Sequence, residues 1–142
     1  MAHNIYHNLV IRASKEAIFN AFTQPEHLNN WWTLTASREP KLEAEYNLNF
    51  TEQYDWYAKV LEVEQNEAFY LKITKADDDW NPTTFGFQLT TIEKGTLVAF
   101  SHTGWKDANH HFKHTSFCWA LLLNALKNYL EKGTVIPFKA RE

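Results

Sequence analysis

Ser101-His102-Thr103-Gly104-Trp105 is the stretch that decides the fold, because it leads into a long helix with the apolar middle Phe117-Cys118-Trp119-Ala120-Leu121-Leu122-Leu123. A helix that is apolar on all sides is expected to be buried, or nearly so. Most of the remaining sequence predicts strands, so we expect a sheet to cover this helix. A curved sheet around one helix often leaves a pocket, and pockets commonly bind small molecules.

Strand patterns occupy most of the chain between its first helical segments and this long helix. Tyr46, Leu48 and Phe50 alternate with polar residues, which is the period of two expected of a strand with one buried face. The loops between successive runs are short, which indicates antiparallel neighbours. We expect strands over residues 5–12, 44–51, 56–63, 68–74, 84–92 and 96–102, with a weaker one over 33–38.

Two short helices are predicted directly after the first strand. Ser14 is a suitable N-cap for a helix over 15–22. Thr23 and Glu26 have the spacing of a capping box, which predicts a second helix that runs through Trp32.

The long helix is predicted over 110–132 and has signals at both ends. Asp107 or Asn109 can cap its start, and Gly133 follows its last turn. The expected fold is therefore α+β, with an antiparallel sheet of about six to seven strands around a long C-terminal helix.

Length and composition narrow the class of protein. The 142 residues predict a single domain over 1–142. A net charge of −3 without any basic run argues against nucleic-acid binding. The longest apolar run, of about seven residues, is too short to span a membrane, and from the first residues we expect no secretory signal. One cysteine, Cys118, excludes an intrachain disulfide. We expect a cytoplasmic protein.

Aromatic residues make up 15% of the chain, which is high enough to ask what they do. Such side chains fill cores, and they also make good pocket walls; the sequence leaves both readings open. If a pocket exists, the side chains expected to line it are those on inward-facing positions of the strands and helices. These are Trp31, Tyr46, Phe85, Phe87, Phe100, His102, Trp119 and Leu122.

Histidines gather at the start of the long helix. His110 and His114 are i, i+4 neighbours, so both can reach one metal ion, with Asp107 or His102 as a third ligand. The alternative is that His110, His111 and His114 form an exposed polar turn, and we expect no metal at this place.

His102 is the polar residue whose position asks most for an explanation. It shares its strand face with Val98 and Phe100, so it should point inward, where a polar group needs a hydrogen-bond partner. Tyr46, Tyr57 or a ligand can provide one, and a histidine can also serve as an acid or base at neutral pH. No nucleophile–base pair or phosphate-binding loop accompanies it, so we expect no catalytic residue and no cofactor.

A family resemblance that covers nearly the whole chain is carried by six segments: Ser14–Phe19, Phe22–Leu28, Trp31-Trp32, Val60–Val63, Gly95–Trp105 and Leu126–Gly133. With these segments the sequence resembles the START-like, Bet v-like superfamily (SRPBCC). Within it, the sequence is similar to the branch of the C-terminal domain of the activator of heat-shock protein 90 ATPase.

The resemblance implies a helix-grip fold and leaves three functions open, because this fold serves several. The first, which the sequence favours because of its aromatic residues at inward-facing positions, is a domain that binds a hydrophobic or amphipathic small molecule between sheet and helix. The second is a co-chaperone-like interaction module with a chaperone as partner. The third is a cyclase-type enzyme that transfers a proton through His102.

Overall fold

The computed structural model describes residues 3–33, 35–37, 42–49, 55–76 and 79–135 of the chain. Its strands form one antiparallel sheet in the order β1-β7-β6-β5-β4-β3-β2. The strands are β1 (His3–Ile11), β2 (Thr35–Ser37), β3 (Glu45–Asn49), β4 (Asp55–Glu64), β5 (Ala68–Lys75), β6 (Thr84–Ile92) and β7 (Gly95–Trp105). The helices are α1 (Lys15–Thr23), α2 (Pro25–Trp31) and α3 (His110–Lys132). This is the predicted helix-grip architecture.

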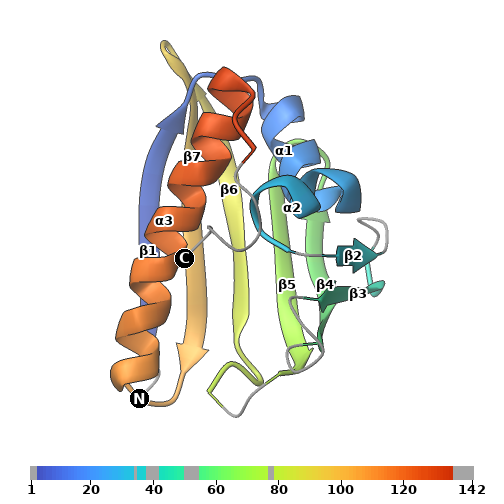
Figure 1. The fold of residues 1–142 in the computed structure, drawn as a ribbon, viewed down its shortest axis with the longest axis vertical. Helices are drawn as coiled ribbons and strands as arrows, with labels where there is room; N and C mark the ends of the chain where they lie inside the picture. The colour runs from blue at the N-terminus through green and yellow to red at the C-terminus, as the bar shows by residue number, and fades with distance from the viewer. Residues whose placement is uncertain (1–2, 34, 38–41, 50–54, 77–78, 136–142) are drawn as a thin grey trace.

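The three helices cover one face of the sheet (Figure 1). α3 runs along β1 and β7, and α1 and α2 lie over the other half of the sheet. Register shifts in β1 and β4 mark bulges, which bend strands and increase their twist. The curved sheet therefore encloses the inner side of α3.

The alternation of side chains places the core between sheet and helices. Along β7, Val98, Phe100 and His102 are buried, as the sequence predicted, and Phe85 and Phe87 of β6 are fully buried beside them. The inner side of α3 contributes Trp119, Leu123 and Leu126 to this core, and Thr115 and Ala125 of the same helix are also buried.

Three of the predicted helix caps are present. Ser14 accepts a hydrogen bond from Ala17 N at 3.1 Å, and Asn109, one of the two residues expected to cap α3, accepts one from Phe112 N at 2.9 Å. Gly133 ends α3 with a φ of 70°, a left-handed conformation that glycine adopts without a steric penalty.

The capping box predicted for the second short helix is wrong. Gln24 occupies the N-cap position of α2 and makes no side-chain cap bond. Thr23 instead ends α1, where its buried hydroxyl donates to Phe19 O at 2.7 Å. The missed feature is that α1 and α2 follow one another with a single residue between them, so Thr23 belongs to the last turn of the first helix.

The predicted strand limits differ slightly from the structure. β7 continues three residues beyond His102, to Trp105. The weak strand expected over 33–38 is the short β2, and residues 34 and 38 lie outside the described part of the chain, as do 50 and 51 at the end of the strand expected over 44–51.

Candidate functional site

The side chain of His102 is fully buried and reaches from β7 to α3 and to the segment that leads into β6. The indole N–H of Trp119 donates to its Nδ1 over 3.0 Å, and Thr83 Oγ1 lies 2.7 Å from its Nε2. An indole nitrogen only donates, so Nδ1 of His102 must accept and Nε2 carries the proton. Thr83 accepts from Nε2 and donates its own proton to Trp80 O.

This arrangement keeps His102 neutral. Burial lowers its pKa to about 3, and the nearby His111 adds a smaller lowering effect. Protonation of Nδ1 would also place two N–H donors, those of His102 and Trp119, against each other. The nitrogen that would act as a base is occupied by Trp119, so the arrangement favours a structural role over proton transfer.

The expected partner of His102 was a tyrosine or a ligand, and the structure supplies Thr83 and Trp119 instead. The hydroxyl of Tyr46 donates to Thr23 O at 2.6 Å, which ties β3 to the end of α1. Sequence alternation placed His102 inside correctly, but it does not show which side chains from α3 and the loop before β6 arrive beside it.

The other expected pocket residues, apart from Leu122, belong to one aromatic cluster. Their rings contact one another directly or through Phe22, Trp32 and Phe69. Trp119 has its ring centroid 4.5 Å from that of Phe100, 5.0 Å from that of Trp32 and 5.6 Å from that of Phe85. Phe87 is 4.4 Å from Phe22. Trp31, Tyr46, Phe85, Phe87, Phe100, His102 and Trp119 are each at most 1% exposed, and Leu122 is partly buried against the same core.

Trp105 has a buried polar atom that this network does not satisfy. Its side chain is 1% exposed, and its indole N–H has no hydrogen-bond partner within the described residues. The ring lies 5.0 Å from His102, 5.4 Å from Phe112 and 5.7 Å from His111. A buried donor of this kind costs free energy unless water or a ligand accepts from it.

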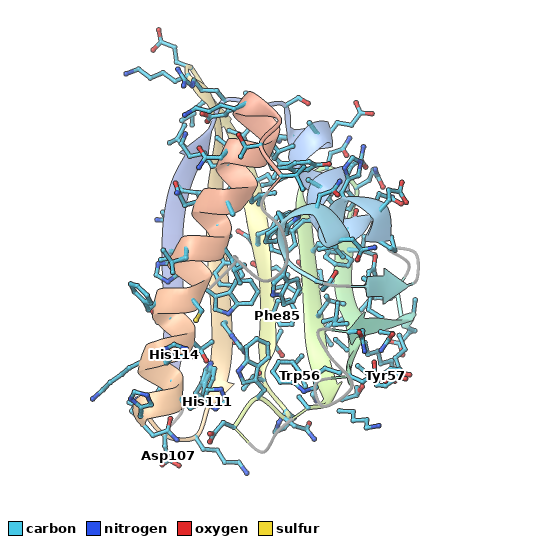
Figure 2. The ribbon with its side chains drawn as sticks, viewed as in Figure 1. Trp56, Tyr57, Phe85, Asp107, His111 and His114 are labelled. Atoms are coloured by element: carbon cyan, nitrogen blue, oxygen red, sulfur yellow. The ribbon has the colours of Figure 1, made fainter. Side chains whose placement is uncertain are left out.

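The histidines of α3 separate into two groups. His111 Nδ1 lies 2.8 Å from Asp79 Oδ2, and this contact is the main reason why the pKa of Asp79 is lowered. His110 and His114 stack on the outer side of the helix with centroids 6.1 Å apart. Figure 2 shows His111 and His114 on the first turns of α3, and Asp107 in the loop before it.

The metal site considered for these histidines lacks its third ligand. His102 is buried and bonded to Thr83 and Trp119, so it does not reach the outer pair. Across the described residues, no group of three His, Cys, Asp or Glu side chains is arranged to hold a metal ion. The same part of the chain contains no helix long and apolar enough to cross a membrane.

Solved structures share this fold over nearly their full length. An Aha1 dimer from Colwellia psychrerythraea has a TM-score of 0.85 and 30% identity, with coverage of 93% of this chain and 98% of that chain. Protein SSP2350 from Staphylococcus saprophyticus has a TM-score of 0.79 and 22% identity, with coverage of 95% and 96%. Protein MLL2253 from Mesorhizobium loti has a TM-score of 0.81 and 18% identity, with coverage of 94% and 100%. The last two support the fold alone.

A protein-family model also matches most of the sequence. It describes activator of Hsp90 ATPase homolog 1-like proteins and matches residues 12–131, from the end of β1 to the last turn of α3. No curated protein matches the chain. With the 30% identity to the Colwellia protein, this match confirms the resemblance: the chain belongs to the family of activator of Hsp90 ATPase homolog 1-like proteins.

Proposed function

We propose that this chain is an interaction module that binds a chaperone ATPase of the Hsp90 type and raises its activity. The observation that carries the proposal is the family match over residues 12–131. The interior agrees with it, because the aromatic side chains that would line a pocket pack against each other and serve the stability of the domain. Function then belongs to the outer surface. The proposal keeps the cytoplasmic location expected from the sequence.

The direct test is the ATPase rate of the Hsp90-type chaperone from the same cell, measured as this chain is added. We expect a rate that increases several-fold and saturates, with complex formation visible by calorimetry over the same concentration range. A helix-grip protein from outside this family serves as the control. An unchanged rate together with no binding at tens of micromolar would exclude this function.

Assembly is the second part of the proposal. The Colwellia relative is described as a dimer, and the two chains match over nearly their whole lengths. We infer that this chain also forms a pair of identical copies.

A second candidate is the binding of a hydrophobic or amphipathic small molecule between the sheet and α3. The observation that favours it is the buried indole N–H of Trp105, which has no partner among the described residues. A ligand that carries a carbonyl or carboxylate group would accept from this donor. Its apolar part would lie against the walls Trp31, Tyr46, Phe85, Phe87, Phe100, His102, Trp119 and Leu122.

Native mass spectrometry of the purified protein tests this candidate. We expect one bound small molecule per chain, and weaker retention of it in Trp105→Phe, which keeps the ring but removes the N–H donor. His114→Ala, on the outer side of α3, is the matched control. Unliganded protein from several preparations, with no thermal shift in a panel of fatty acids and sterols, argues against ligand binding.

A further inference from the structure

The outer side of α3 is unusually apolar for a surface that faces water. No charged residue occurs from His114 to Leu126. Phe117 is 61% exposed and Leu121 is 40% exposed, one turn apart on the side of the helix away from Trp119. A helix at the surface normally carries charged or polar residues on this side. The sequence predicted that the middle of this helix is buried all round, and the single chain covers only its inner half.

The exposed residues of this side follow a regular spacing. His114, Phe117, Leu121, Asn124 and Asn128 are separated by three, four, three and four positions, which is the spacing of the contact line between two packed helices. We call these five residues the outer seam. His114, Phe117, Leu121 and Asn124 are exposed, and Asn128 is half-buried.

The outer seam is complementary to itself when two copies of the helix run in opposite directions. With the two-fold axis beside position 119, Phe117 of one copy faces Leu121 of the other, and His114 faces Asn124. Apolar residues then meet apolar ones, and polar residues meet polar ones. An interface whose centre lacks charged residues fits a second copy better than a charged partner.

The edge of β1 is another surface on which two copies could meet, because β1 is one of the two edge strands of the sheet. Side chains of α3 contact backbone groups near the end of this strand. Lys127 Nζ donates to Val10 O at 2.8 Å, and Arg12 N, just after β1, donates to Glu131 Oε2 at 2.8 Å. Covered edges of this kind oppose strand pairing between chains.

We propose that two copies of this chain meet through the outer seam of α3, packed as an antiparallel helix pair. The inference rests on the dimer proposed above and names its surface. A second copy is the partner that fits, because the outer seam is complementary to itself in the antiparallel arrangement and its middle has no charged residue. A contact limited to one helix from each copy lies at the small end of protein interfaces, so the dimer should dissociate on dilution to the micromolar range.

Sedimentation equilibrium of the full chain tests the surface. We expect a monomer–dimer equilibrium for the wild type, and a dissociation constant at least tenfold higher for Phe117→Glu and for Leu121→Glu. Tyr6→Glu is the matched control, since Tyr6 is 67% exposed on β1, away from the seam. Far-UV circular dichroism shows that each variant is folded; because both seam side chains are exposed, folding should be preserved.

Cys118, next to the outer seam and the only cysteine of the chain, allows a second measurement without the introduction of a cysteine. A short bis-maleimide should link two wild-type chains through it, and the Phe117→Glu chain much less. A wild type that is monomeric at every concentration would overturn both the dimer and the seam. A dimer that both glutamate variants leave intact would overturn the seam alone, and neither outcome depends on the chaperone ATPase measurement.

Discussion

At the scale of single residues, His102 shows how burial fixes the state of a titratable group. Trp119 donates to one ring nitrogen and Thr83 accepts from the other, so the side chain is satisfied only as one neutral tautomer. Its environment is set by three separate segments of the chain: β7, α3 and the residues before β6. The alternation of β7 predicted the direction of the side chain, but the hydrogen-bond partners depend on where α3 crosses the sheet.

This residue makes the stability of the protein depend on pH. The folded-state pKa of His102 is lowered to about 3, while an unfolded histidine titrates near 6.5. Between pH 6.5 and 3, His102 therefore binds a proton in the unfolded chain but not in the folded chain. The stabilising effect of the neutral ring is complete above pH 6.5 and is lost as the pH falls from 6.5 toward 3, at up to about 1.4 kcal/mol per pH unit.

Urea unfolding between pH 7.5 and 4.5 measures this effect. We expect His102→Gln to be less stable than the wild type at pH 7.5, because Gln does not reproduce both ring contacts. The difference between the two proteins should shrink as the pH falls, because only the wild type carries the His102 proton uptake. A difference that stays constant over this range would mean that the folded protein protonates His102 at the same pH as the unfolded chain.

At the scale of elements, the sequence predicted the type of each helix and strand better than their exact surroundings. The alternation of Val98 and Phe100 with polar residues was enough to orient β7, because a strand has only two faces. The start of α2 was misjudged, since Thr23 suits two positions: an N-cap, or the last turn of the preceding helix. Only the packed structure shows that it donates to Phe19 O.

α3 shows a different limit of sequence patterns. The apolar run from Phe117 to Leu123 predicted burial on all sides. Hydropathy does not show whether the helix is buried by its own chain or by a second chain. Trp119 and Leu123 are buried within the chain, whereas Phe117 and Leu121 remain exposed. The same apolar run thus has one face that packs within the chain and another face on which we propose that a second copy packs.

At the scale of the whole molecule, one continuous aromatic cluster joins the helices to the sheet. The ring centroid of Trp119 in α3 lies at most 6.2 Å from those of rings at the end of α2, in β6 and in β7. For the residues of this cluster, the sequence did not decide between a filled core and a ligand pocket. The residues expected at inward-facing positions do lie together, because the alternation of a strand and the spacing of a helix identify which side chains face inward. Whether a ligand binds among them depends on how the elements pack, and a sequence pattern does not describe this packing.

The cluster predicts that sheet and helices unfold as one cooperative unit, in agreement with the single domain expected from the length of the chain. Trp119→Ala should lower the free energy of unfolding by about 3–5 kcal/mol, because it removes a large buried side chain and leaves a cavity. Phe117→Ala, on the exposed side of the same helix, is the matched control and should change it by less than about 1 kcal/mol in the monomer. Circular dichroism at 222 nm and tryptophan fluorescence should report one shared transition in each protein, as expected of a two-state domain. If the two signals gave different transitions in the wild type, helices and sheet would unfold independently, and the aromatic cluster would not couple their stability.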